Sequence, residues 1–235
     1  MKISIIVPTL NEENNLPTLF KSLVEQPFSD YEIIIADGGS KDKTLDIAQQ
    51  SGCKIVSGGS PAEGRNEGAK IAQGELFLFL DADMVLHPSF LEKLIKQFEK
   101  RKLDIASCSI YPSKKIDKVF HASYNLWAKL LEGFIPHASE VILIKREVHR
   151  IIRGFDKEIK IAEDHSYARK AAKYGKFGFF LRLSATTSSR RFDRDGRIKT
   201  YLKFVLAGVY MFFLGDIKSD IFKYKFNHYS EKNKK

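Results

Sequence analysis

Two aspartates, Asp81 and Asp83, are the residues of this chain best suited to chemistry. They directly follow the five apolar residues Leu76 to Leu80, a run that fits a short strand covered on both faces. Residues two apart in an extended segment point the same way, so the two carboxylates can aim at one point. Mg²⁺ usually takes only one or two protein carboxylates and completes its shell with water and phosphate oxygen. The pair therefore indicates a site for a divalent cation with phosphates, or else an acidic loop that merely ends a strand.

The elements that must position this pair alternate along the first half of the chain. Apolar strand patterns are separated by amphipathic helix patterns with short connections, which is typical of βαβ units. The predicted strands cover 3–7, 32–36, 54–56 and 76–80, and the predicted helices cover 14–25, 42–50 and 65–72. The sequence therefore predicts an α/β fold with a mainly parallel sheet and helices on both faces. In such a sheet, ligands bind at the carboxyl ends of the strands.

The second half continues with less regular elements. Apolar residues at helical spacing predict a helix over 88–101, and Gly175 marks the end of another over 164–174. Strands are predicted at 105–110, 141–144 and 177–181. The segment 117–136 is rich in aromatic and aliphatic residues, and we expect a helix there that borders an acceptor groove.

Length and composition describe an ordinary globular protein. A chain of 235 residues with 43% hydrophobic and 29% charged residues is long enough for one sizeable core, and too short for two. Cys53 and Cys108 lack metal-ligand spacing, and the apolar start of the chain is too short for a signal peptide before Pro8. These features favour a cytoplasmic protein with reduced thiols.

A formal net charge of +10 predicts attraction to an anionic partner, which could be nucleic acid, a phosphorylated substrate or an acidic membrane surface. The basic residues are spread along the chain and form no nucleic-acid-binding motif. Charge alone does not select the partner, and no nucleic acid is expected.

The C-terminal part has a different character. Residues 201–215 are apolar apart from Lys203, yet this run is shorter than the roughly twenty residues needed to span a bilayer. It could be an interfacial helix flanked by Lys199, Lys218, Lys223 and Lys225, with peripheral membrane contact through 201–225 on the cytoplasmic face. Alternatively, it packs on the domain or on another subunit. We therefore divide the chain into a domain over 1–198 and a helical segment with a basic tail over 199–235.

Several polar clusters fall where the predicted strands and helices meet, and together they are more specific than any one alone. They are Pro8-Thr9-Leu10-Asn11-Glu12, Asp37 to Thr44, Gly64-Arg65-Asn66-Glu67-Gly68, Asp81-Ala82-Asp83, Gly154-Phe155-Asp156, Glu163-Asp164-His165 and Ser188 to Phe192. This ordered set, over roughly residues 3–195, resembles the family 2 glycosyltransferases. The resemblance implies a GT-A fold and transfer of a sugar from a nucleotide diphosphate donor with inversion at the anomeric carbon.

The resemblance also implies roles for individual residues, which differ along the chain. Pro8, Leu10 and Glu12 would surround the nucleoside, with Asp37 on the base and Arg65 on the base or the diphosphate. Asp81 would hold the ribose or share the metal, Mn²⁺ or Mg²⁺, and Asp83 would be the principal metal ligand. Asp164 would be the general base, with Glu163 as the second candidate, and Arg190 and Arg191 would close over the diphosphate.

Two positions depart from the pattern of the family. Many relatives have two acids where this chain has Asp37-Gly38, and a third acid soon after Glu-Asp where it has His165-Ser166. Contacts to the base and on the acceptor side are therefore less defined. His165 could touch the acceptor or tune Asp164, or be a surface or capping histidine, and His87 could be an extra metal ligand or a loop residue.

The chemistry can also be argued from the residues. Cleavage of the bond between sugar and diphosphate builds negative charge, which a cation on Asp83 and the guanidinium groups of Arg190 and Arg191 would stabilise. The acceptor hydroxyl needs a base on the far side of the sugar, which Asp164 can supply unless it is only the N-cap of the following helix. The basic residues after Arg191 suggest a mobile flap over the donor.

Two other functions compete with this hypothesis. A nucleotidyltransferase that makes sugar nucleotides would need a glycine-rich phosphate loop after the first strand, where this chain has Pro8-Thr9-Leu10-Asn11. A non-catalytic protein that binds nucleic acid or an acidic polymer would rely on the positive charge alone. The sequence leaves open whether the donor is a UDP- or a GDP-sugar, whether the acceptor is lipid-linked, a glycan or a small polar molecule, and the oligomeric state.

Overall fold

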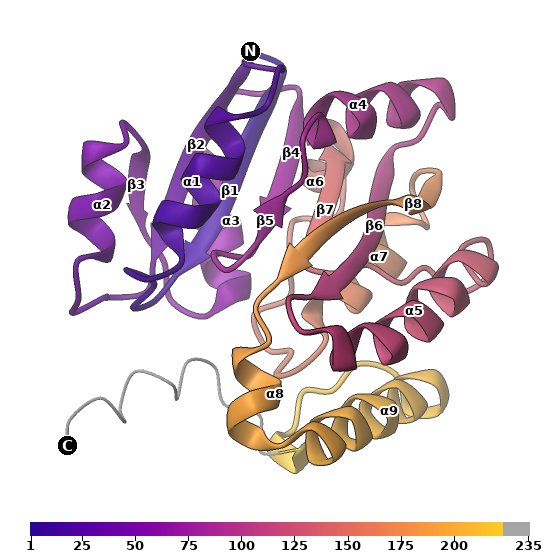
Figure 1. The fold of residues 1–235 in the computed structure, drawn as a ribbon. Helices are drawn as coiled ribbons and strands as arrows, with labels where there is room; N and C mark the ends of the chain where they lie inside the picture. The colour runs from indigo at the N-terminus through magenta and orange to yellow at the C-terminus, as the bar shows by residue number, and fades with distance from the viewer. Residues whose placement is uncertain (223–235) are drawn as a thin grey trace.

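A computed structural model describes residues 1–222, which form an eight-stranded sheet flanked by helices (Figure 1). The strands are β1 (Ile3–Thr9), β2 (Tyr31–Asp37), β3 (Lys54–Ser57), β4 (Leu76–Leu80), β5 (Val85–Leu86), β6 (Ile105–Pro112), β7 (Val141–Lys145) and β8 (Phe177–Thr187). The helices are α1 (Leu16–Val24), α2 (Thr44–Gln50), α3 (Pro61–Ile71), α4 (Phe90–Lys100), α5 (Lys115–Leu130), α6 (Arg146–Ile151), α7 (Glu163–Ala171), α8 (Arg190–Asp195), α9 (Arg197–Leu214) and the 3-10 helix η1 (Asp220–Phe222).

The sheet has the order β3-β2-β1-β4-β7-β6-β8-β5. Strands β3, β2, β1 and β4 are parallel, as the alternating pattern predicts, and β6 is parallel to β8. Strand β7 runs antiparallel between β4 and β6, and β5 runs antiparallel to β8. The predicted α/β fold with a mainly parallel sheet is confirmed, with antiparallel pairing confined to the second half.

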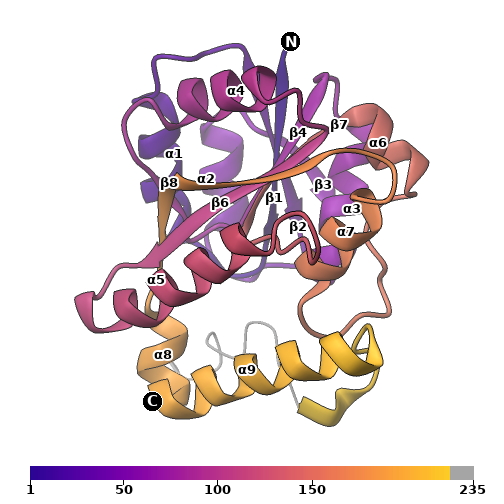
Figure 2. The same cartoon turned by 90° about the vertical axis from the view of Figure 1, so that its right-hand side faces the viewer.

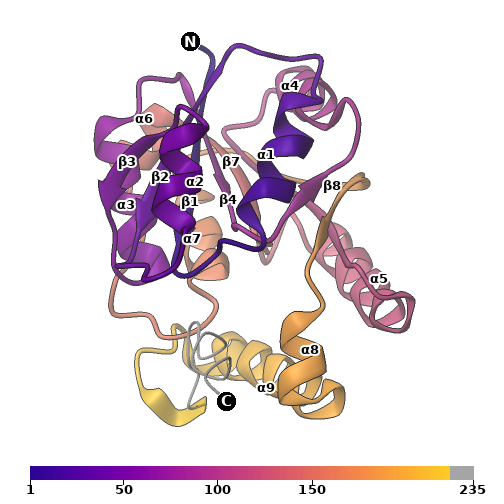
Figure 3. The same cartoon turned by 60° about the vertical axis from the view of Figure 1, so that its left-hand side comes forward.

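Helices cover both faces of the sheet because alternate strand residues point to opposite sides. In β4, Leu76, Leu78 and Leu80 pack with α1 and α4 in one buried cluster. On the other face, Phe77 and Phe79 pack with α3, α6 and α7. Figure 3 shows the strands between these two layers of helices. The central strand is therefore buried on both sides, as its apolar run predicts.

Some element boundaries differ from those predicted. Helix α3 begins at Pro61, not at 65, because Ser60 and Glu63 form a capping box at its N-terminus. Strand β8 continues to Thr187, since it regains pairing with β6 after a register shift between Cys108 and Ser109. The short elements β5, α6 and α8 are not among the predicted ones.

Helix α9 lies beside α8 at the end of the molecule opposite the N-terminus, apart from the layers of the sheet (Figure 2). Its buried residues Ala207 and Met211 form a small cluster with Ile161 and Ile217. Within residues 1–222, no helix combines the length and the apolar character required to cross a membrane. The predicted flanking residues Lys223 and Lys225 lie outside the described residues.

Candidate active site

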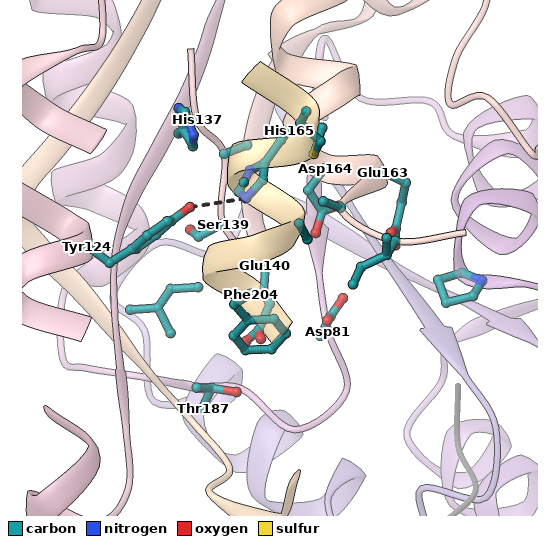
Figure 4. Close-up of a pocket in the computed structure, with 18 of the residues that line it drawn as sticks. Asp81, Tyr124, His137, Ser139, Glu140, Glu163, Asp164, His165, Thr187 and Phe204 are labelled. Atoms are coloured by element: carbon teal, nitrogen blue, oxygen red, sulfur yellow. Dashed lines mark hydrogen bonds between the residues drawn. The ribbon is translucent and has the colours of Figure 1, made fainter. Parts of the chain in front are cut away.

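A cavity of about 1060 Å³ opens at the carboxyl ends of β1 and β4. Most of the predicted site residues line it: Pro8, Leu10, Glu12, Arg65, Asp81, Asp83, Glu163, Asp164, Arg190 and Arg191. These residues come from segments far apart in the sequence, and the parallel part of the sheet brings several of them to one edge. Figure 4 shows part of this wall, with Asp81, Glu163 and Asp164 near one another.

The acidic couplet Asp81 and Asp83 begins where β4 ends. Burial raises the pKa of Asp83 to about 6, against the lowering effect of Arg190, whose Nε lies 3.4 Å from its Oδ2. The nearby charges of Asp81 and Glu12 also raise it. A carboxyl group in such a setting binds a cation readily, because a positive charge relieves both burial and repulsion.

Arg65 is the buried cation of the site, with 2% of its side chain exposed. Its Nη2 donates to Asp81 Oδ1 at 2.7 Å, and its Nη1 donates to Glu163 Oε1 at 2.9 Å and lies 3.2 Å from Asp164 Oδ1. The guanidinium therefore links the couplet to the predicted base. Its predicted contact with base or diphosphate stays a prediction, since these carboxylates occupy it here.

Glycines in α3 explain how Arg65 reaches this position. A Cβ at Gly68 would lie 2.5 Å from Ile6 Cγ2, and one at Gly64 would lie 3.3 Å from the Ala36 carbonyl oxygen. Only residues without a side chain allow α3 to pack this closely on β1 and β2. This close packing places Arg65 next to Asp81, at the carboxyl end of β4.

Glu163 and Asp164 form the first turn of α7. The N-cap is Ala162, with a φ of +60°, so the alternative reading of Asp164 as the N-cap is wrong. Burial raises the pKa of Asp164 well above its ordinary value, Arg65 lowers it, and Glu163 and Asp81 raise it. Asp164 Oδ1 is buried without a hydrogen-bond partner. This oxygen faces the cavity wall without a donor, so the assignment of Asp164 as general base stays a prediction.

Arg190 contacts both Glu12, which follows β1, and Asp83, which follows β4. Its Nη1 and Nη2 donate to Glu12 at 2.9 and 2.7 Å, a bidentate pair, while its Nε faces Asp83. Arg190 and Arg191 belong to α8, and the residues predicted as a flap, Arg194, Arg197 and Lys199, lie in α8 and α9. The cationic groups therefore lie at the couplet, where the charge of a leaving diphosphate would develop.

Asp37 and His87 do not line the cavity. The Asp37 carboxylate accepts hydrogen bonds from Thr9 Oγ1 at 3.0 Å and from the backbone N–H groups of Gly39 and Ser40 at 2.9 and 2.8 Å. It orders the loop after β2, and its predicted contact with the base stays a prediction. His87 lies 3.3 Å from Thr186 Oγ1, in a loop.

Glu140 is a site residue that the sequence does not single out. It immediately precedes β7, whose first residue Val141 pairs with Leu80, so Glu140 comes next to Asp81 across the ladder. Burial, together with the charges of Asp81 and Asp83, raises its pKa to about 8 against the lowering effects of the Thr187 hydroxyl and Arg191. Its Oε2 is buried without a hydrogen-bond partner. Figure 4 shows its side chain among those of Asp81, Ser139 and Thr187.

A group of neutral polar rings lies next to the predicted base. His165 Nε2 is 3.4 Å from the Tyr124 hydroxyl, and the rings of His137 and His165 are 4.9 Å apart (Figure 4). Burial lowers the pKa of His165 to about 3, and His137 lowers it further. His165 is thus uncharged at neutral pH and lines the cavity beside Asp164.

The remainder of the cavity is lined mostly by apolar residues, with His121, Tyr124, His137, Arg169 and Lys173 as its polar members. We call this part the apolar chamber; it is formed by α5, the segment 131–138 and α9. The apolar side chains or glycines that line it are Phe120, Leu131, Gly133, Phe134, Ile135, Pro136, Ala138, Phe204, Val205, Ala207, Gly208, Met211 and Phe212. The predicted helix over 117–136 is confirmed in part, because α5 ends at Leu130 and an irregular segment follows.

The couplet fits a divalent cation that is shared with a diphosphate. Within residues 1–222, no three His, Cys, Asp or Glu side chains are arranged to hold a metal ion by themselves. Mg²⁺ and similar cations do not need such a set, since phosphate oxygens and water can complete the shell around one or two carboxylates. Asp81 and Asp83 supply these carboxylates, and Glu140 lies next to Asp81 across the ladder.

A mainly parallel sheet with an acidic couplet after β4, and with the Glu163-Asp164 pair of α7 beside it, defines a glycosyltransferase of the GT-A fold. The model of glycosyl transferase family 2 matches residues 4–173, so the chain belongs to this family. The uncharacterized glycosyltransferase EpsJ of Bacillus subtilis is 27% identical over 186 residues, which are 70% of this chain and 54% of that protein. The chain thus spans about half the length of this curated relative.

Solved structures agree on the fold. The mannosyltransferase PcManGT from Pyrobaculum calidifontis, in complex with GDP-Man and Mn²⁺, has a TM-score of 0.72 at 19% identity, covering 93% of this chain and 65% of its own. Staphylococcus aureus TarS 1–349, in complex with UDP-GlcNAc, has a TM-score of 0.67 at 22% identity, covering 80% and 58%. The predicted family and fold are confirmed.

Proposed function

We propose that this protein is an inverting glycosyltransferase that transfers a sugar from a UDP- or GDP-sugar to an acceptor hydroxyl, with Mn²⁺ or Mg²⁺. The observation that carries the proposal is that Asp81, Asp83 and Asp164 line one cavity with Arg190 and Arg191. The solved relatives support it, since one contains GDP-Man with Mn²⁺ and another contains UDP-GlcNAc.

The leaving group is handled at the couplet. Asp83 and Asp81 would hold the divalent cation, which neutralises charge on the departing diphosphate when it is bound. Arg190, whose guanidinium already lies against Asp83, adds a second positive charge there, together with Arg191. In this arrangement, Pro8, Leu10 and Glu12 lie at the nucleoside end of the cavity.

Activation of the acceptor is assigned to α7. Asp164 would take the proton from the acceptor hydroxyl as that oxygen attacks the anomeric carbon and the bond to the diphosphate breaks. Burial raises the pKa of Asp164 and the Arg65 guanidinium lowers it, so the affinity of this carboxyl group for a proton is set by the cavity and not by bulk water. Glu163, held by Arg65, is the second candidate.

Nucleotide binding tests the metal site. A thermal-shift screen with Mn²⁺ should show stabilisation by UDP or GDP and by the correct sugar nucleotide, because a ligand that binds the folded state raises its stability. Asp83→Ala should lose the Mn²⁺-dependent part of this shift. Asp164→Asn should keep the shift but lower transfer by about 100-fold or more. An unchanged shift in Asp83→Ala, or full transfer by Asp164→Asn, would show that the roles are assigned wrongly.

The location of the reaction belongs to the same proposal. We infer peripheral contact with the cytoplasmic membrane face through α9 and the residues that follow it. Several apolar side chains of α9 are exposed, among them Ile198 at 85%, Leu202 at 56% and Phe213 at 75%. Helix α9 contains Lys199 and Lys203 and no acidic residue. An apolar face with basic flanks suits an anionic lipid surface.

A further inference from the structure

We propose that the apolar chamber binds the hydrocarbon chain of an amphiphilic acceptor, whose polar head reaches Asp164. This inference rests on the proposed function, because it names the acceptor class of the same site. The sequence leaves a lipid-linked, a glycan and a small polar acceptor open, and the chamber walls discriminate among them.

The wall that α9 contributes has no polar side chain. It consists of Phe204, Val205, Ala207, Gly208, Met211 and Phe212. A groove that binds a glycan needs side chains that hydrogen-bond to its hydroxyl groups, because a buried hydroxyl without a partner is costly. A hydrocarbon chain has no such requirement and gains free energy from contact with these residues.

The chamber extends from the predicted base to the surface. At its inner end lie Asp164 and the neutral His165, both on α7. At its outer end Phe134 is 87% exposed and Phe212 is 63% exposed, although both line the cavity. Large apolar residues exposed at the opening of a cavity indicate that an apolar ligand enters there.

The surroundings favour a lipid over a protein as occupant. The exposed Lys173 also lines the cavity, and no acidic residue belongs to α9. A cation beside an apolar chamber matches a lipid that carries a phosphate between its head and its chain. The apolar outer face of α9 would lie on the same bilayer that supplies this lipid.

Two alkyl phosphates test the chamber. In the full-length protein, decyl phosphate below its micelle concentration should bind at least about tenfold more tightly than butyl phosphate, since burial of two methylene groups already gives that ratio. Gly208→Trp should abolish the difference. A Cβ at Gly208 meets no atom within 4 Å, so the indole can occupy the chamber without displacing the backbone.

Matched variants complete the experiment. Val209→Trp adds the same ring to the next residue of α9, which is 50% exposed and does not line the cavity, and it should keep the preference for decyl phosphate. Unchanged circular dichroism and thermal midpoints would show that both variants are folded. Equal binding of the two phosphates by the wild type, or tight decyl phosphate binding by Gly208→Trp, would overturn the inference. A dimer that decyl phosphate dissociates would identify a second copy as the occupant and would also overturn it.

This outcome is separable from that of the proposed function. The Mn²⁺-dependent shift with UDP or GDP in the wild type reports the nucleotide end of the cavity alone. If that shift is absent while decyl phosphate binds, the donor assignment fails and the chamber remains. If the shift is present and the two phosphates bind equally, the chamber assignment fails and the transferase remains.

Discussion

At the scale of single residues, the carboxylates of the cavity differ in their partners. Asp81 has Arg65 and Asp83 has Arg190, whereas Glu140 Oε2 is buried with no hydrogen-bond donor. A buried carboxyl oxygen without a donor destabilises a fold, and natural proteins usually keep such a group for its function. Glu140 lies beside the couplet in the cavity that also contains Asp164, so it lies where the hydroxyl groups of a transferred sugar would be.

Glu140→Gln should therefore stabilise the protein and impair transfer. The raised pKa of Glu140 means that the folded state disfavours its charged form, so the stability gain should grow as pH rises from about 5 through 8. We expect at least ~1 kcal/mol at pH 8.5, or a rise of about 2–4 °C in thermal midpoint. Loss of the carboxyl group's hydrogen bond to the sugar should lower kcat/KM about 10- to 100-fold.

Thermal denaturation at several pH values, together with initial rates, measures both effects. Glu67→Gln serves as a control, because Glu67 lies on the exposed part of α3 and pairs with Lys70. A lower thermal midpoint together with an unchanged rate would contradict both parts of the prediction.

Sequence reasoning finds the residues of this site that belong to local patterns. Asp81 and Asp83 follow an apolar strand, and Glu163 and Asp164 form a recognisable pair. Glu140 carries no such signal, because its closeness to Asp81 depends on the antiparallel register of β4 with β7, which local spacing does not reveal. The pairing of Arg65 with three carboxylates is likewise a product of the tertiary fold.

At the scale of elements, α6 and α7 are joined by a buried polar contact. His149 of α6 lies 2.6 Å from the hydroxyl of Tyr167 of α7, and the ring of Tyr167 stacks on Phe155 at 3.8 Å. Burial lowers the pKa of His149 to about 4. The histidine is therefore neutral in the folded state and becomes protonated near pH 6.5 on unfolding.

This contact should make the packing of α6 on α7 sensitive to acid. A lowered pKa in the folded state gives stability that is complete above about pH 6.5 and is lost as pH falls toward 4. The wild type should therefore lose about 2 kcal/mol from His149 between pH 7.5 and 5. His149→Asn lacks this titration, so its deficit in unfolding free energy should shrink by a similar amount over that range.

Urea unfolding of both proteins at the two pH values measures the difference. Comparison of the two proteins cancels the titration of the site carboxylates, whose raised pKa values act in the opposite direction. A deficit that is independent of pH would disprove the assignment.

Elements are predicted well where their signals are local. The strand at 76–80 has the predicted bounds. The start of α3 also has a local signal, because Ser60 and Glu63 have the spacing of a capping box, and the predicted start at 65 does not use it. Strand β8 could not be followed beyond Leu181, because its extension depends on pairing with β6.

At the scale of the whole molecule, α9 presents an apolar face at one end, away from the layered sheet (Figure 2). The double variant Leu202→Glu with Phe213→Glu places two negative charges on residues that are 56% and 75% exposed. We expect its partition onto vesicles of phosphatidylglycerol to fall at least about tenfold, because it loses apolar contact and gains repulsion.

Sedimentation with phosphatidylglycerol and with phosphatidylcholine vesicles measures this partition. Val24→Glu, on the opposite side of the fold in α1 and 78% exposed, is the control and should bind as the wild type does. Equal partition of all three proteins, or no preference for the anionic lipid, would rule out α9 as the membrane contact.

The parallel half of the sheet can be predicted from the sequence, because strand and helix patterns alternate in each βαβ unit. The antiparallel position of β7 between β4 and β6 cannot be predicted, since nothing in its apolar run Val141 to Ile144 gives the direction of the strand. The apolar chamber was anticipated only as a groove beside 117–136, because its second wall comes from α9.

Arg190 forms a bidentate ion pair with Glu12, from which it is separated by 178 positions in the sequence. A polypeptide growing on the ribosome therefore contains Glu12 and Asp83 long before Arg190, whose guanidinium balances their charge. Until then, the charges of Glu12 and Asp83 lie near each other without this counterion, so the N-terminal strands reach the final charge balance of the cavity only after α8 is made.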